Sequence, residues 1–223
     1  MKVKIIAKTQ ICDSELLKEL KSSSSEELIM YCARASNPKN QTSGDTGLLN
    51  YCSKHGHWSI FEMSNMVVEI ETSRGIATQI LRHRSFSFQE FSQRYKEVTA
   101  FDDTFEIYNA RSQDSKNRQN SIDNMSEEDR LWFEAAQLDM QQEALEKYEE
   151  ALQRGIAKEQ ARFLLPLNVK TKLYMNGTLR SWIHYLHLRT GNGTQQEHKE
   201  IADAIKTIFI EHFPNVAEAL KWK

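Results

Sequence analysis

The stretch from residue 169 to residue 189 reads VKTKLYMNGTLRSWIHYLHLR. Its first part, residues 169–176, predicts a β-strand. Residues 178–189 predict an α-helix, because apolar side chains recur at helical spacing on one face: Leu179, Trp182, Ile183 and Leu186. The other face of that helix carries nitrogen-rich side chains: Arg180, His184 and His187. The stretch therefore indicates a fold that mixes strands with amphipathic helices.

The segments around this stretch predict further strands and helices. Strands are expected where apolar and polar side chains alternate, at residues 2–8 and 62–72. Helices are expected at residues 48–54, 74–82 and 157–165, after the N-cap Ser25, and after a capping box of Thr194 and Glu197. Polar segments rich in turn residues are expected to be loops: residues 35–46 and the mobile 109–125. We find no dividing linker, so the sequence predicts one α+β domain over residues 1–223.

Residues 126–154 predict a long helix that Ser126 caps and that Gly155 ends. Leucine recurs there at every seventh position: Leu131, Leu138, Leu145 and Leu152. A coiled coil would need apolar partners at the second seam position, where Gln142 and Glu149 stand instead. We therefore expect one buried leucine stripe.

The composition is typical of a globular protein, with 39% hydrophobic and 27% charged residues. The 29 basic and 31 acidic residues give a formal net charge of -2, which argues against a nucleic-acid binder. Glycine is scarce, and neither GxGxxG nor GxxxxGK[ST] occurs. Because these glycine-rich loops are absent, a bound nucleotide would be held largely by side chains.

Cysteine usage and hydropathy favour a cytoplasmic location. Cys12, Cys32 and Cys52 form no CxxC pair, so they predict neither a disulfide framework nor a cysteine-based metal site. The first eight residues lack the apolar core of a signal peptide, and no apolar stretch reaches membrane-spanning length. We therefore expect no membrane contact.

Residues 82–95, which read RHRSFSFQEFSQRY, stand apart from the rest of the chain. Arginine offers a planar fork for phosphate, serine adds short donors, and the interleaved aromatic rings offer stacking faces. This combination suits an anionic ligand that carries a ring, such as a nucleotide. A solvated basic strand that pairs with surface carboxylates is the alternative, and composition alone leaves both open.

The same segment resembles the flavin-dependent thymidylate synthases. Arg82-His83-Arg84, seven residues and then Ser92 match their RHRX7S signature. Further segments resemble family motifs in the same order along the chain: residues 56–62 (GHWSIFE), Gln79, residues 162–168 (RFLLPLN), Arg180-Ser181, Leu188-Arg189, and Gln195 with Glu197. The resemblance thus spans residues 56–197.

This resemblance implies both an activity and a fold. The family makes dTMP from dUMP, with methylenetetrahydrofolate as carbon donor, FAD as hydride carrier and NADPH as reductant. It uses no cysteine nucleophile, and none of the three cysteines here lies in a matched motif. The implied fold is an α+β domain with a mainly antiparallel sheet and long flanking helices. The implied assembly is a homotetramer with active sites at subunit interfaces.

The resemblance also implies roles for individual residues. Those expected at FAD are His57, Ser59, Arg82, His83, Arg84, Glu90, Thr178, Arg180, His184 and Gln195. Those expected at dUMP are Gln79, Arg82, Glu90, Phe91, Ser92, Gln93, Arg94, Tyr95, Arg162 and Arg189. Arg189 is the expected catalytic residue, because a cation beside N3 of the pyrimidine stabilises its anionic form. Ser92 is expected to bind phosphate rather than to act as a nucleophile, since it has no evident partner base. For His57 and Tyr95, structural roles beside Trp58 and in the core are the alternatives.

The chain departs from the family at several positions. Thr178 and His184 stand where members commonly have asparagine, and residues 190–193 lack a histidine that many members carry. These differences bear on the flavin contacts and on the folate contact.

Two other functions compete with this interpretation. Histidines could bind a metal for a phosphohydrolase: His55 with His57, or His184 and His187 with His198. No HExxH or HD pair supports such a site, and we expect no metal. An RNA-binding module is disfavoured by the near-neutral charge and the absence of RNP-type and KH-type motifs.

Overall fold

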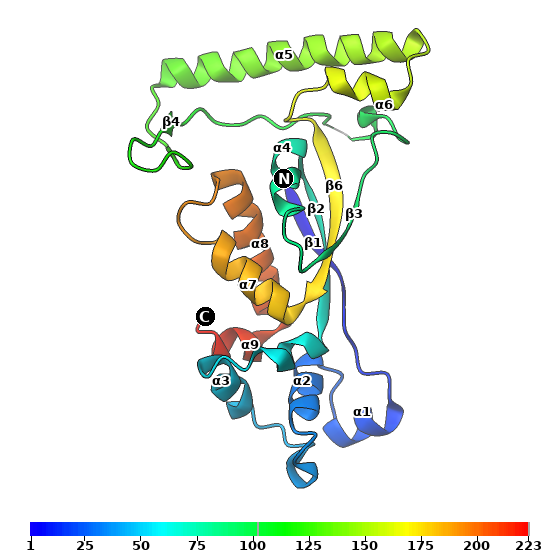
Figure 1. The fold of residues 1–223 in the computed structure, drawn as a ribbon, viewed down its shortest axis with the longest axis vertical. Coiled ribbons are helices and arrows are strands. Elements are labelled where there is room, and N and C mark those ends of the chain that lie inside the picture. The colour runs from blue at the N-terminus through cyan, green and yellow to red at the C-terminus, as the bar shows by residue number, and fades with distance from the viewer. Residues whose placement is uncertain (102, 223) are drawn as a thin grey trace.

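The chain contains both strands and helices, as Figure 1 shows for residues 1–101 and 103–222, which this computed structural model describes. The strands are β1 (Lys2–Lys8), β2 (Asn65–Ser73), β3 (Ser87–Glu90), β4 (Ser112–Gln113), β5 (Ser121–Ile122) and β6 (Lys170–Thr178). The α-helices are α1 (Ser14–Leu20), α2 (Ser25–Ala33), α3 (Gly47–Lys54), α4 (Arg74–Ile80), α5 (Glu127–Gln153), α6 (Lys158–Ala161), α7 (Leu179–Arg189), α8 (Gln196–His212) and α9 (Pro214–Ala219). Short 3-10 helices are η1 (Pro38–Asn40), η2 (Trp58–Met63), η3 (Val98–Ala100) and η4 (Arg162–Leu164).

The centre of the molecule is a four-stranded sheet in the order β1-β2-β6-β3, with every neighbouring pair antiparallel. Its side chains alternate as the strand period requires, so Met66, Val68 and Ile70 of β2 and Leu173 and Met175 of β6 are fully buried. Helices α4, α7 and α8 pack against the sheet and cover this apolar face (Figure 1). The α+β class and the antiparallel sheet are therefore confirmed.

Helix α7 anchors itself to the sheet through Trp182, as its predicted apolar face requires. The Trp182 side chain is fully buried, and its Nε1–H donates to the Met66 carbonyl at 3.0 Å. Its ring packs edge-on to Phe86, with 4.8 Å between centroids. Phe86 in turn lies so close to β6 that a Cβ on Gly177 would sit 2.5 Å from its ring. Glycine at position 177 therefore allows the strand, the ring and the helix to meet.

The long helix α5 begins and ends as predicted, but its leucines do not form one buried stripe. Ser126 caps the helix through the Asp129 N–H, and Gly155 follows it with φ of +79°. Tyr148 and Gln141 face inward and are buried. An ideal helix drifts by about 20° per heptad, and this drift turns the later leucines of the repeat toward that face and the earlier ones away from it.

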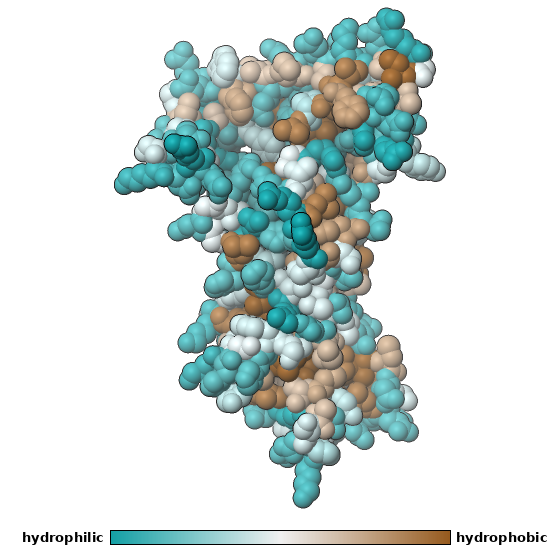
Figure 2. Space-filling model, in the orientation of Figure 1, coloured by the Kyte–Doolittle hydropathy of each residue, from teal (hydrophilic) through white to brown (hydrophobic). Residues whose placement is uncertain are grey.

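The leucine repeat is thus split between the core and the surface. Leu145 and Leu152 pack against the cluster around Tyr148, whereas Leu131 and Leu138 are 59% and 51% exposed. Trp132 and Met140 are exposed beside them. Three apolar side chains near α6 are exposed as well: Phe163, Leu164 and Leu167. Figure 2 shows apolar side chains on the surface at the α5–α6 end of the molecule.

Three further local predictions are wrong. Residues 109–125 form not a plain loop but a small hairpin of β4 and β5, in which Ser112 pairs with Ile122. Helix α2 begins at Ser25 because Ser24, not Ser25, is its N-cap. Thr194 does not cap α8, since its hydroxyl contacts the Leu188 carbonyl at 3.5 Å and the N-cap position falls on Gln195.

Two strands pass into helices without an intervening loop. Ser73 ends β2, and its hydroxyl accepts from the Ile76 N–H to cap α4. Thr178 ends β6, and its hydroxyl accepts from the Ser181 N–H at 3.2 Å to cap α7. The two helices that follow these central strands carry several of the predicted site residues.

Candidate active site

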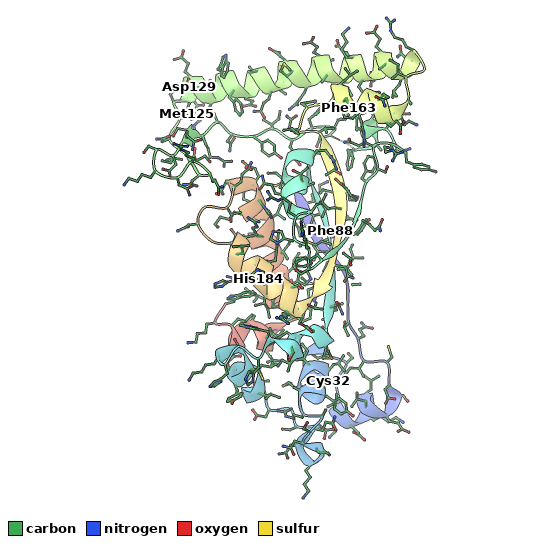
Figure 3. All side chains as sticks on the ribbon, in the orientation of Figure 1. Cys32, Phe88, Met125, Asp129, Phe163 and His184 are labelled. Carbon is green, nitrogen blue, oxygen red and sulfur yellow. The ribbon has the colours of Figure 1, made fainter. Side chains whose placement is uncertain are left out.

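A cavity of about 780 Å³ opens beside the polar face of α7. Arg180, His184 and His187 line it, since spacings of four and three residues place them on one side of the helix. Ser181 and Ile183 of the same helix line it too, and the remaining lining residues come from other parts of the chain: Ser53, Trp58, Glu62, Ser85, Leu220 and Trp222. Its volume lies in the range of small-molecule sites. Figure 3 shows His184 on α7, far from Phe163 and Asp129 at the α5–α6 end.

The cavity brings together several residues predicted for the cofactor. Arg180 forms an ion pair with Glu62 of η2, so a charged pair stands at its wall. His57 and Ser59 flank the lining residue Trp58 and are exposed. The Thr178 hydroxyl, predicted to contact flavin, caps α7.

His83 and Arg189 meet at the C-terminal end of α7. Nε of Arg189 donates to Nε2 of His83 at 2.9 Å. This nitrogen can accept only when the imidazole is neutral. Burial, together with the nearby charges of Arg189 and His184, lowers the pKa of His83 to about 4. The neutral ring therefore holds the guanidinium by Nε, and the two terminal nitrogens have no hydrogen-bond partner among the described residues. Arg82 and Arg84 flank this contact and are exposed.

Tyr185 and His198 form a buried pair next to His83, and the sequence had predicted no structural role for either residue. The Tyr185 ring packs edge-on to His83, with 4.8 Å between centroids. The Tyr185 hydroxyl lies 3.0 Å from Nε2 of His198, which is fully buried. Burial lowers the pKa of His198 to about 3 and raises the pKa of Tyr185. A helical-spacing argument could have found this histidine, since position 198 continues the apolar face of Ile201 and Ile205.

We expect these buried histidines to make the fold sensitive to acid. Between pH 6.5 and the lowered pKa of His198, the unfolded chain binds more protons than the folded one, so stability falls as pH falls. From pH 6.5 to pH 5 the free energy of unfolding should drop by about 2 kcal/mol through His198. Urea unfolding at fixed protein concentration checks this, and His198→Gln should flatten the pH dependence. His212→Gln, on the same helix, is the matched control; equal slopes in both variants would refute the prediction.

The second half of the signature lies around β3 and the turn that follows it. Glu90 is held by an ion pair with Arg74 and by a hydrogen bond from the Thr171 hydroxyl at 3.0 Å. The Phe91 N–H donates to the Lys172 carbonyl at 2.8 Å. The Glu90 carboxylate is thus fixed inside the subunit.

The turn at residues 92–95 presents the residues predicted for phosphate. Ser92 is exposed, and its carbonyl accepts from the Tyr95 N–H at 3.0 Å. Arg94 forms an exposed ion pair with Glu159 of α6, at 3.1 Å. Gln93 is buried, and among the described residues its side-chain nitrogen has no hydrogen-bond partner. Tyr95 is 85% exposed, so the alternative of a core aromatic is wrong.

Within the single chain, the predicted dUMP residues form two separate groups. Gln79 and Arg189 belong to the first, on α4 and α7. Arg94 and Arg162 belong to the second, beside and after α6, which Figure 1 shows away from α7. Among the described residues, no hydrogen bond or ion pair joins the two groups. One chain therefore presents two half-sites.

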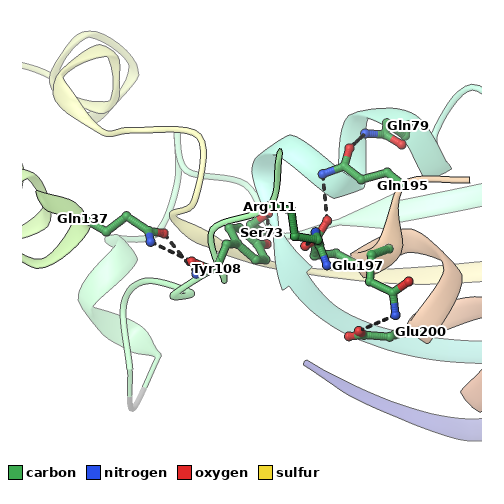
Figure 4. Close-up of polar contacts among 9 residues, drawn as sticks. Ser73, Gln79, Tyr108, Arg111, Gln137, Gln195, Glu197 and Glu200 are labelled. Carbon is green, nitrogen blue, oxygen red and sulfur yellow. Dashed lines mark hydrogen bonds and ion pairs between the residues drawn. The ribbon is translucent and has the colours of Figure 1, made fainter. Parts of the chain in front are cut away.

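Gln79 is part of a polar chain that reaches the hairpin. Its Nε2 donates to Oε1 of Gln195 at 2.6 Å, and Nε2 of Gln195 donates to Oε2 of Glu197 at 2.8 Å. Arg111, which directly precedes β4, forms an ion pair with Glu197 (Figure 4). The predicted flavin residue Gln195 thus contacts a predicted dUMP residue.

Within residues 1–101 and 103–222, no three His, Cys, Asp or Glu side chains cluster as metal ligands would. His198 is turned to Tyr185 rather than to His184 and His187. In the same part of the chain, no helix has the length and apolar character needed to cross a bilayer.

Comparisons with known proteins point to one family. A family model described as thymidylate synthase complementing protein matches residues 15–215. A probable flavin-dependent thymidylate synthase of Paramecium bursaria Chlorella virus 1 is 56% identical over 199 residues, which cover 88% of this chain and 91% of the relative. A flavin-dependent thymidylate synthase of Synechocystis sp. is 55% identical, with 89% and 91% covered. The structure of a UMP/dUMP methylase, PolB, from Streptomyces cacaoi bound with 5-Br dUMP matches with a TM-score of 0.79 at 25% identity, over 99% of this chain and 94% of that one.

Proposed function

The chain belongs to the flavin-dependent thymidylate synthase family, and from this membership we propose that it converts dUMP to dTMP by reductive methylation. The observation that carries the proposal is the contact between His83 of the signature and Arg189 at the end of α7. It joins the family's most specific motif to the expected catalytic residue.

The residues beside α7 fit a flavin. The cavity offers an arginine, histidines and Trp58, and the exposed Arg84 directly precedes the lining residue Ser85. Cationic donors suit the negative charge of reduced flavin, and an aromatic ring suits its planar system. FAD, when bound, supplies hydride transfer. His57, Ser59, His83, Arg180 and His184 would hold it, and Thr178 would serve through its cap of α7.

The chain's own residues would bind and activate the nucleotide. Ser92, Arg94 and Arg162 would hold its phosphate, which would take the place of Glu159 on Arg94. The free guanidinium nitrogens of Arg189 would face N3 of the pyrimidine and stabilise its anion. Methylenetetrahydrofolate would supply the carbon and NADPH the reducing equivalents. No cysteine nucleophile takes part in this scheme.

The two half-sites would combine across subunits of a homotetramer. Arg189 and Gln79 of one subunit would meet the phosphate-binding turn of another. The exposed apolar residues of α5 and the α6 region support association, because patches of this kind mark protein interfaces. Inside each subunit, the main core cluster runs from Ile29 to Ala219, which supports a single domain. Light scattering that finds only monomers at working concentration would contradict the shared site.

The visible spectrum tests the function directly. Purified protein supplied with FAD should show flavin absorption that NADPH bleaches and dUMP alters. Addition of dUMP and methylenetetrahydrofolate should then yield dTMP. A protein that takes up no FAD, or that carries metal or RNA instead, would refute the proposal.

Ser92→Ala should weaken dUMP binding without stopping turnover. A hydrogen bond to a charged phosphate is lost, so KM for dUMP should rise about tenfold or more while kcat stays near the wild-type value. Steady-state kinetics measures both. Ser87→Ala, an exposed hydroxyl of β3, is the matched control. A Ser92 variant that still binds dUMP but makes no dTMP would refute the role of Ser92 as a binder.

A further inference from the structure

The polar chain from Arg111 to Gln79 has a fixed direction. Glu197 is 6% exposed, and its carboxylate can only accept hydrogen bonds. It accepts from Arg111 on one oxygen and from Gln195 on the other. Because Gln195 must turn its NH2 group toward this anion, its carbonyl oxygen must face Gln79. The ion pair thus dictates the orientation of the first amide.

The same logic carries one residue further. The Gln195 oxygen requires a donor, so Gln79 must point its own NH2 group inward, as the 2.6 Å contact shows. The Gln79 carbonyl oxygen and its second N–H hydrogen are then left for a ligand. A flipped amide would set two oxygens against each other. Gln79 is therefore held in one of the two orientations that its shape allows (Figure 4).

We propose that Arg111 and Glu197 are positioning residues that fix the amide orientation of Gln79 for nucleotide binding. The inference rests on the proposed function, in which Gln79 contacts dUMP. The outward Gln79 oxygen accepts from an N–H or O–H donor of the nucleotide. A reversed amide would offer a donor there and would bind less well.

The proposal also gives a role to the hairpin. Arg111 directly precedes β4, and the hairpin's Asn117 side chain lies next to Gly193, where a Cβ would sit 3.6 Å from its Nδ2. Residues 190–193 follow the catalytic Arg189. The hairpin region thus contacts two segments near the predicted dUMP residues. It contacts Glu197 through the Arg111 ion pair and residues 190–193 through Asn117.

Glu197→Gln tests whether the carboxylate sets the direction of the hydrogen bonds from Arg111 to Gln79. A neutral amide at position 197 can donate or accept, so it no longer dictates how Gln195 turns. We expect the Kd and KM for dUMP to rise about tenfold, with kcat changed less than about twofold. Glu200→Gln is the matched control, since it removes the same charge from the same helix at an exposed contact with Gln196. It should leave both constants unchanged.

A double-mutant cycle with Gln79→Ala shows whether Glu197 acts through Gln79. The double variant should bind dUMP no more weakly than Gln79→Ala alone, because the amide to be oriented is gone. Gln195→Leu removes the hydrogen bonds between Glu197 and Gln79 at an exposed residue. It should also raise the Kd for dUMP about tenfold, and it replaces Glu197→Gln if that variant does not fold. Each Kd is measured on enzyme saturated with FAD, because Gln195 is also a predicted flavin residue.

The outcomes separate this inference from the function. Additive effects of Gln79→Ala and Glu197→Gln, or an unchanged Kd in both Glu197→Gln and Gln195→Leu, would overturn the inference while wild-type dTMP formation upholds the function. A wild-type protein that binds no dUMP would overturn both.

Discussion

Arg189→Ala is expected to retain its flavin and to lose dTMP formation by about 100-fold or more. Removal of one preorganised group that stabilises developing charge typically has an effect of this size. Arg189 is the group that we expect beside the pyrimidine, and its link to the fold is the hydrogen bond to His83. Flavin absorption and dTMP formation, measured on the same preparation, provide the test.

Arg189→Lys serves as the matched control. Lysine restores the positive charge but not the planar fork, so it should recover part of the activity. The cavity residues Arg180 and His184 are untouched in both variants, which is why flavin should stay bound. An Arg189→Ala enzyme with near-wild-type turnover would contradict the catalytic assignment, and one without flavin would place Arg189 in the cofactor site.

Trp182→Ala is expected to reduce the free energy of unfolding by about 3–5 kcal/mol, the usual range for an aromatic side chain removed from a core. Trp182 is fully buried, and its contacts tie α7 to both β2 and Phe86. The loss would leave a cavity and remove the side-chain hydrogen bond to the Met66 carbonyl. Urea unfolding at fixed protein concentration measures the change.

Trp182→Phe separates packing from hydrogen bonding. It keeps an aromatic ring and should cost less than the alanine variant. Phe86 and Tyr185 contact Trp182, and Tyr185 contacts His83, so we also expect reduced dTMP formation in Trp182→Ala at temperatures where it remains folded. A loss of stability below about 1 kcal/mol would show that Trp182 does not anchor α7.

The sequence predicted the elements whose pattern is local. Strands β2 and β6 alternate apolar and polar residues, and α7 repeats its apolar residues at helical spacing, so their existence and their buried faces could be inferred. The two ends of α5 followed from Ser126 and Gly155. Which leucines of the repeat are buried could not be inferred, because this depends on which face of α5 packs against the rest of the protein.

The candidate site likewise contains residues that the sequence predicted and partners that it could not predict. The resemblance placed Arg189 and the signature near a common ligand, and His83 does contact Arg189. The partners that hold such residues are remote in sequence: Arg111 and Glu197 are 86 residues apart. Only tertiary structure brings such pairs together. The hairpin was missed because its strands are short, and the burial of His198 was missed although its spacing to Ile201 and Ile205 continues their apolar face.

The direct passages from strand to helix at Ser73 and Thr178 limit which changes in chain length this protein can tolerate. One residue inserted between Thr178 and Leu179 would rotate α7 by about 100° about its axis. Arg180 and His184 would then leave the cavity while Trp182 left the core. An insertion after Ser73 would rotate α4, and Gln79 with it. Natural length variation in this chain should therefore gather at the tip of the hairpin and avoid both junctions, where a single codon gained or lost would displace the candidate site residues.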